Sequence, residues 1–258
     1  MSKRWFEKRP RRVAKVTALL LFASLPGHAA DGEEGRFELG LETGAVGFSR
    51  NDVRVPGDAG TEFDMTALTG SGATAFARLD GRWRIDDRHG LRLVIAPLEV
   101  SGGGRLSRDT TFSGETFAAG ETAGTYRFNA YKLTYRYTLS ERGPWRWGIG
   151  FTGVVRDARI ALRQGVRRAD KENVGFVPAL HLSGDYRWNE RWSIGVDFDG
   201  LAGGPGRLFD IALKLHRELG ERWRLGFGYR TLEGGADTEE VYNFAWLHYA
   251  VLDLRYRL

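Results

Sequence analysis

An alternation of apolar and polar residues constrains the fold of this chain more than any other feature of its sequence. A period of two places successive side chains on opposite faces of a β-strand, and helical spacing is nearly absent from residue 31 onward. The clearest stretch covers residues 244–257. One of its faces carries Trp246, His248, Ala250, Leu252, Leu254, Tyr256 and Leu258, and the other carries Asp253, Arg255 and Arg257.

The same pattern recurs along most of the chain. It is found in ten segments: residues 37–45, 73–85, 91–102, 123–139, 145–157, 174–189, 192–201, 207–219, 222–233 and 244–257. With 42% apolar residues the chain is too hydrophobic for disorder, and it has no run of about 18 apolar residues that would form a spanning helix. The sequence therefore predicts an all-β fold with ten strands, and counts of eight or twelve stay open.

The connections between these segments differ on the two sides. Glycine, proline, asparagine and aspartate favour tight turns at the short ones, which are residues 86–90, 140–144, 189–191 and 220–221. The others are mostly long and polar: residues 52–72, 104–122, 158–173 and 234–243, with a shorter one at 202–206. This arrangement predicts a single up-and-down antiparallel meander. We expect bulges at Pro97 and Pro178, because proline cannot donate a ladder hydrogen bond.

The positions of the tryptophans favour a membrane barrel over a soluble sandwich. Membrane barrels gather amphipathic rings at the boundary between water and lipid. The predicted aromatic girdle flanks the short connections and consists of Trp83, Trp145, Trp147, Trp188, Trp192 and Trp223. Because lipid offers no hydrogen-bond partners to a strand edge, the strands are predicted to close into a transmembrane β-barrel.

The polar faces of the strands would then line a narrow lumen. Its predicted charges are Glu38, Glu42, Arg78, Asp80, Arg82, Lys132, Arg136, Asp185, Asp197, Asp199, Asp210, Lys214, Arg230, Asp253 and Arg255. We expect them to pair across strands, since an unpaired charge in such a place is costly. The sequence thus predicts a charge-paired interior with a structural or interaction role, and a narrow pore for small solutes is the alternative.

The first thirty residues predict a secretory signal peptide. Seven basic residues and one acidic residue accompany the apolar run at 16–25, which is too short to span a bilayer and is followed by small residues. Cleavage is expected after Ala29 or Ala30, which leaves residues 31–258 as the mature barrel. The whole chain has 38 Lys and Arg against 33 Asp and Glu, so the mature part keeps 31 against 32. Its charge balance therefore gives no reason to expect nucleic acid as a partner.

The signal peptide, the alternating strands, the girdle and the C-terminal strand together resemble the small outer-membrane β-barrel proteins of Gram-negative bacteria, the OmpA- and OmpW-like group. The resemblance covers the whole mature chain, although Leu258 stands where the family usually ends in Phe. It implies periplasmic short turns, exposed long loops, contact with outer-membrane lipid and insertion by the outer-membrane assembly machinery. We expect a monomer.

Two enzymatic hypotheses and one binding hypothesis remain beside these. His181, Ser183 and Asp185 share one face of a strand, and His-x-Ser resembles the lipid A deacylase of outer membranes. A ten-strand count is similar to that of the omptin proteases, for which Asp199, Asp210 and His216 are the candidates. The binding hypothesis places recognition of a surface partner in residues 104–122 and 234–243. No motif establishes an enzymatic activity. With no cysteine and five histidines, no metal or cofactor is predicted.

Overall fold

A computed structural model describes residues 36–258, so the predicted signal peptide lies outside the described residues. These residues form strands and one short helix, in the order β1 (Phe37–Arg54), β2 (Phe63–Asp64), α1 (Thr66–Thr69), β3 (Thr74–Arg84), β4 (His89–Ala96), β5 (Glu99–Leu106), β6 (Thr110–Phe112), β7 (Glu115–Phe117), β8 (Gly120–Arg142), β9 (Trp145–Gln164), β10 (Arg167–Arg187), β11 (Trp192–Gly203), β12 (Gly206–Leu219), β13 (Trp223–Asp237) and β14 (Tyr242–Arg257). Within this range no helix is long and apolar enough to cross a membrane.

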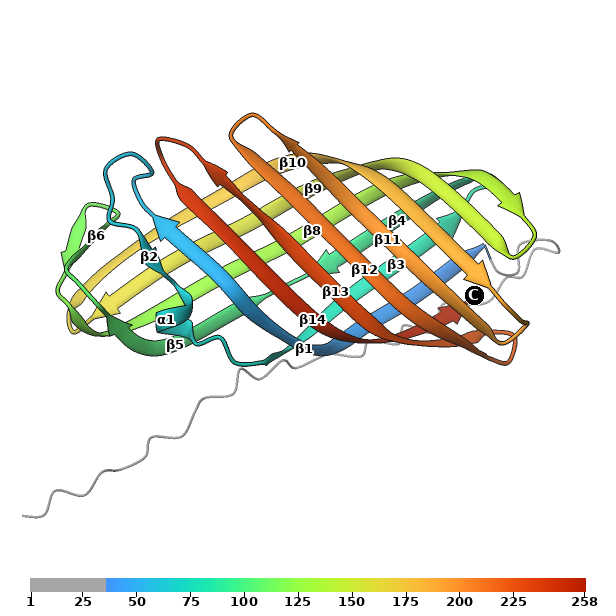
Figure 1. Ribbon diagram of the computed structural model, residues 1–258, viewed down its shortest axis with the longest axis horizontal. Helices are drawn as coiled ribbons and strands as arrows, with labels where there is room; N and C mark the ends of the chain where they lie inside the picture. The colour runs from blue at the N-terminus through green and yellow to red at the C-terminus, as the bar shows by residue number, and fades with distance from the viewer. Residues whose placement is uncertain (1–35) are drawn as a thin grey trace, which may run out of the picture. The chain divides into compact units, whose positions relative to one another are not determined.

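Ten antiparallel strands close into a barrel, which Figure 1 shows from the side. The ring runs β1, β3, β4, β8, β9, β10, β11, β12, β13 and β14. It closes where β14 pairs with β1, from Glu38 opposite Arg257 to Arg54 opposite Tyr242. Two further strands join the sheet, since β5 continues β4 along β8 and β2 pairs with the end of β1, while β6 and β7 form a separate hairpin. The predicted ten-stranded up-and-down barrel is confirmed.

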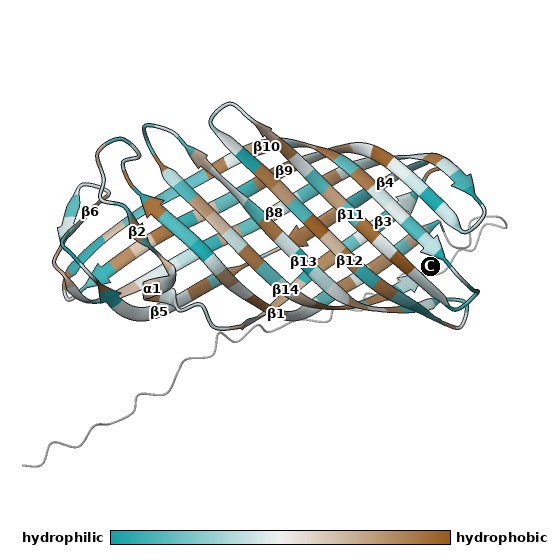
Figure 2. Cartoon of the chain, viewed as in Figure 1, coloured by the Kyte–Doolittle hydropathy of each residue, from teal (hydrophilic) through white to brown (hydrophobic). Residues whose placement is uncertain are grey.

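The outer surface of the barrel is apolar across the middle of the strands. Figure 2 shows hydrophobic and hydrophilic residues alternating along each strand, and Leu79, Leu133 and Phe151 are among the large apolar side chains that point outward and are exposed. Near the short connections Trp145 stacks on Trp147 and Trp188 stacks on Trp192. The ring centroids of Trp145 and Trp147 are 5.2 Å apart. Such a surface has the composition of a lipid-facing band bordered by amphipathic rings.

Two short connections use the same device to turn the chain. The Asp86 carboxylate accepts hydrogen bonds from the backbone N–H groups of Arg88 and His89, both at 2.8 Å. The Asn189 side chain likewise accepts from the N–H groups of Arg191 and Trp192. Both are Asx-type turns, which explains the tight geometry that the composition predicts. The two backbone donors favour the ionised carboxylate and lower the pKa of Asp86.

Two of the predicted long loops are wrong. Residues 158–173 and 234–243 are mostly strand, because β9 and β10, and β13 and β14, continue to tight turns, while the shorter connection at 202–206 is a tight turn between β11 and β12. Charged residues occupy both faces of the β10 extension, and in the β9 extension the pattern is reversed, with Ile160 and Leu162 buried and Arg163 exposed. Ion pairs on the outward face join β9 to β10 there, such as Arg159 with Glu172 at 3.3 Å. The loops that remain long are those between β1 and β3 and between β5 and β8.

The bulges expected at the two prolines are also wrong. Pro97 lies in the break between β4 and β5, but the register along β8 is unchanged across it. The Asn129 side chain accepts the N–H of Leu98 at 3.2 Å and partly replaces the ladder there. Pro178 lies opposite Gly153 in a continuous register. No extra residue is inserted at either proline.

The register shifts lie elsewhere in the barrel. One occurs in β1 between Phe48 and Arg50, and the other in β8 between Thr138 and Ser140. Each adds one residue relative to the neighbouring strand, which is the definition of a β-bulge. The first of them lies on the strand that closes the barrel.

Near the long connections, one part of the barrel wall is closed by side-chain and backbone packing instead of strand pairing. The β3–β4 ladder stops at Leu79 opposite Ile95, and among residues 36–258 no pairing joins the rest of β3 to β5. Helix α1 lies there against β5 and β8 (Figure 1). Its backbone comes so close to β5 that a Cβ added at Gly104 would lie 1.9 Å from the carbonyl oxygen of Ala67. Glycine is therefore required at this inward position.

We predict that Gly104→Ala destabilises the barrel by about 1–3 kcal/mol, because the added methyl group overpacks α1 against β5. The matched control is Gly103→Ala, since a Cβ at Gly103 would meet nothing within 4 Å. The measurement is the free energy of unfolding in detergent micelles, followed by tryptophan fluorescence in urea. Equal effects of the two substitutions would show that α1 does not pack as described.

Candidate functional site

The interior of the barrel is filled by two layers of different chemistry. Near the long connections it is apolar, and this apolar layer includes Val46, Phe48, Phe76, Tyr126, Leu162, Leu232 and Leu247 from the strands. The loops add Met65, Leu68, Phe112 and Phe117, which are almost completely buried. The charge-paired lumen that the sequence predicts therefore occupies only part of the interior.

The second layer consists of buried charges near the middle of the barrel. This charged layer comprises Glu42, Arg78, Asp80, Arg92, Lys132, Asp199, Asp210, Lys214, Arg230, Asp253 and Arg255. Glu42 contacts three cationic side chains, as Asp80 and Asp210 also do. It forms an ion pair with Lys214, lies 3.1 Å from Arg230 and lies 3.7 Å from Arg78. One carboxylate thus offsets positive charge from three different strands.

Lys132 connects two aspartates on neighbouring strands. Its Nζ lies 3.0 Å from Asp199 and 2.5 Å from Asp210. Asp199 also accepts a hydrogen bond from the hydroxyl of Thr152 and contacts Nδ1 of His181 at 2.7 Å. Every oxygen of the Asp199 carboxylate therefore has a partner, which is the condition for keeping a charge in a dry interior.

The third part of the charged layer is centred on Asp80. Its carboxylate contacts Arg255 at 3.3 Å and accepts a hydrogen bond from Nε of Arg92 at 2.7 Å. Arg255 also lies 2.9 Å from Asp253. Sequence reasoning missed Arg92, although Leu91, Leu93 and Ile95 alternate around it. Applying the period of two to that strand places Arg92 on the inward face.

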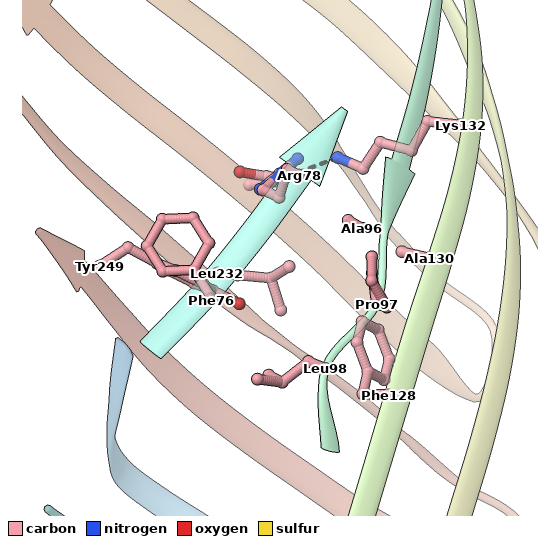
Figure 3. A pocket seen from close by; sticks show the side chains of 11 residues that line it. Phe76, Arg78, Ala96, Pro97, Leu98, Phe128, Ala130, Lys132, Leu232 and Tyr249 are labelled. Carbon is pink, nitrogen blue, oxygen red and sulfur yellow. Dashed lines mark hydrogen bonds and ion pairs between the residues drawn. The ribbon is translucent and has the colours of Figure 1, made fainter. Parts of the chain in front are cut away.

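A small pocket marks the boundary between the two layers. It has a volume of about 20 Å³, enough for one water molecule. Figure 3 shows Arg78 and Lys132 on one side of it and Leu98 and Phe128 on the other. The pocket lies beside the break at Pro97.

The remaining predicted lumen charges lie nearer the short connections. There a cavity of about 720 Å³ is lined by Glu38, Arg82, Arg136 and Asp185, among others. Asp197 lies deeper and contacts Arg92 at 3.5 Å. The cavity stops at the charged layer, because Arg82 at its inner end also contacts Asp80 at 3.2 Å. It is a vestibule that opens on one side.

The structure does not join the residues of the two enzymatic hypotheses into a triad. His181 contacts Asp199, whereas the hydroxyl of Ser183 accepts a hydrogen bond from Arg136 at 2.7 Å. Asp185 borders the vestibule, and His216 is buried between Gly195 and Gly226. Asp199 and the omptin-type candidate Asp210 share Lys132 inside the charged layer. Both hypotheses stay predictions, and this geometry gives them no nucleophile within reach of a base.

In the part of the chain that the structure describes, no group of three or more His, Asp or Glu side chains is arranged to hold a metal ion. The acidic residues of the interior are instead neutralised by arginine and lysine. The arrangement can hold charge in place and block the lumen, which is a structural capacity.

Comparison with solved structures relates this fold to bacterial outer-membrane proteins. The outer membrane protease OmpT from Escherichia coli has a TM-score of 0.62 at 10% sequence identity, over 90% of this chain and 99% of that chain. Ail, the attachment invasion locus protein of Yersinia pestis, has a TM-score of 0.40 at 8% identity, over 86% and 99%. Neisserial surface protein A has a TM-score of 0.36 at 11% identity, over 86% and 97%.

The likeness to OmpT is one of fold alone, because the sequences share so little. No protein-family model matches this chain, and no curated protein matches it in sequence. What the comparison with OmpT supports is the β-barrel fold. The particular activity has to be argued from the residues themselves.

We predict that Glu42→Gln lowers the free energy of unfolding by about 3–5 kcal/mol, because it leaves buried cations without their carboxylate. The control is Glu121→Gln, since Glu121 pairs only with Arg105 at 3.7 Å on the exposed surface. Its expected cost is about 0–1 kcal/mol. Urea unfolding in detergent micelles measures both. A small loss for Glu42→Gln would mean that the charged layer is not dry.

Proposed function

We propose that this chain is an integral outer-membrane β-barrel protein of a Gram-negative envelope, with a structural or interaction role and a closed lumen. The observation that carries the proposal is the filling of the interior by the charged layer and the apolar layer together. The exposed apolar band and the stacked tryptophans support its place in a membrane. Within that class, the OmpA- and OmpW-like group is the one that the sequence pattern favours.

The same proposal covers the partners of the protein. Outer-membrane lipid would surround the apolar band, and the outer-membrane assembly machinery would insert the barrel. The ring closes within one chain, so no second copy is needed to satisfy its strand edges. We propose a monomer on this basis.

A pore is the weaker alternative, and the vestibule is the feature of residues 36–258 that favours it. The vestibule has room for small solutes, but a path across the barrel would have to pass the ion pairs around Glu42, Asp80 and Asp210. Beyond them it would meet the apolar layer, including Leu68 and Phe112. Moving either layer aside would expose charges without partners or apolar surface, and both are unfavourable.

We predict that the purified protein gives no reproducible conductance steps in a planar lipid bilayer, because both layers block the lumen. A known general porin inserted in the same bilayer serves as the positive control. Single-channel recording at both polarities is the measurement. Discrete steps of constant size would overturn the closed lumen and favour the pore.

We also predict that the protein needs detergent to remain dissolved, because its outward side chains form an apolar band. In detergent it should sediment as one chain and migrate differently on gels with and without boiling, as a stable barrel does. Analytical ultracentrifugation and gel mobility provide the measurements. A compact monomer that stays dissolved without detergent would contradict a place in the membrane.

A further inference from the structure

Three polar side chains form a hydrogen-bonded chain on the outer surface of β13, β14 and β1. The hydroxyl of Ser49 lies 2.8 Å from Nε2 of His248. On the other side of the same ring, Nδ1 lies 2.5 Å from the hydroxyl of Tyr229. A hydroxyl, an imidazole and a group that orients the imidazole, all within hydrogen-bond reach, are the parts of an activated nucleophile.

The bulge in β1 accounts for the position of Ser49. The register passes from Phe48 opposite Leu247 to Arg50 opposite Trp246, so Ser49 has no partner in the ladder. Ser49 and Arg50 are both exposed, whereas Phe48 before them is buried. Bulges re-aim side chains and are frequent beside active sites.

The chain of hydroxyl and imidazole groups lies at a chemical boundary on the surface. On one side the outward residues are apolar, and Phe227 and Leu252 are about half exposed. On the other side they are charged, with Arg50 paired to Asp52 and Arg207 paired to Glu233. In a bilayer, the carboxylic ester of a lipid lies at the same boundary, between its acyl chain and its polar headgroup.

An exposed tryptophan next to His248 marks the same boundary between apolar and charged surface. Trp246 is exposed next to His248, and its Nε1 donates a hydrogen bond to the hydroxyl of Thr231 at 2.7 Å. Amphipathic indole rings prefer the interface between lipid and water. His248 is therefore held where a lipid ester and water can both reach it.

We propose that Ser49 and His248 are the catalytic residues of a serine esterase site that hydrolyses the carboxylic ester of a membrane lipid, with Tyr229 as a positioning residue. In this site the proton of the imidazole is on Nδ1 and the hydroxyl oxygen of Tyr229 accepts the hydrogen bond from it, so Nε2 is free to act as the base toward Ser49. The longer contact of the Ser49 hydroxyl, 3.4 Å to the carbonyl oxygen of Trp246, does not compete with Nε2. This site is separate from the lumen and adds an activity to the proposed function.

The reaction requires only the lipid and water. Ser49 Oγ forms a bond to the ester carbonyl carbon while its proton moves to Nε2 of His248. The tetrahedral intermediate then breaks the bond to the alkoxide, which takes the proton from His248, and an acyl group remains on Ser49. Water attacks that acyl group, with His248 accepting its proton, and the fatty acid leaves as Ser49 recovers its hydrogen.

The test uses the full-length mature barrel in mixed micelles containing dipalmitoyl phosphatidylethanolamine. We expect palmitate release from the wild type, and covalent labelling of Ser49 by a fluorophosphonate, located by peptide mass spectrometry. Ser49→Ala and His248→Gln should each lower the rate by about 100-fold or more. Tyr229→Phe should lower kcat and leave KM unchanged, because it alters the orientation of the base and not lipid binding.

Ser101→Ala is the matched control. Ser101 is an exposed serine on β5 whose hydroxyl contacts Thr125 at 2.9 Å, and this variant should retain the full rate. Unheated gel mobility shows whether each variant is a folded barrel. The proposal is overturned by a wild type that releases no palmitate, by labelling at another serine, or by Ser49→Ala with an unchanged rate. Loss of activity in Ser183→Ala alone would instead assign hydrolysis to the lumen.

Discussion

The closed ladder of backbone hydrogen bonds is the constraint from which the rest of this structure follows. An N–H or C=O group in an apolar surrounding has no solvent partner, so each strand needs a neighbour on both sides. The pairing of β14 with β1 meets this requirement along the whole length of β1. Closure also fixes which side chains face outward, since one step along a strand exchanges the two sides.

The interior then has to accommodate every inward side chain in a narrow space. The barrel divides this task between ion pairs and apolar packing. Buried cations and carboxylates alternate across strands around Glu42, Lys132 and Asp80, so that each charge meets opposite charge within a few ångströms. Nearer the long connections, loop residues such as Leu68 and Phe112 complete an apolar layer. Each layer excludes water from the lumen by a different physical route.

Much of this architecture could be predicted from the sequence, because a period of two is visible wherever one face is apolar and the other polar. The strands, the short turns and the ten-strand ring follow from it. The pattern fails where both faces are charged, as at the start of β10, and the extension of β9 beyond Asp157 was predicted as a loop because its apolar residues Ile160 and Leu162 face inward instead of outward. It also fails after Ser49, where a bulge places Asn51 and Val53 on the inward side.

The candidate sites were less accessible to sequence reasoning, because they depend on which strands become neighbours. The inward charges follow from alternation, and Arg92 could have been found in the same way. The contact between Ser49 and His248, in contrast, joins residues near opposite ends of the chain. It exists only because β1 pairs with β14 in one register and because the bulge turns Ser49 outward. No local pattern around either residue carries that information.

The seal between β3 and β5 has a mechanical consequence. Van der Waals contact holds α1 against Gly104, and the nearby backbone bond from Met65 to Asn51 ties the segment to β1 instead. Sliding α1 off β5 would thus cost dispersion and apolar burial while every rung of the ten-strand ring stayed intact. The segment is attached to β1 and is not part of the strand ladder. Changes in its length or sequence should therefore leave the strand pairing of the ring unaffected.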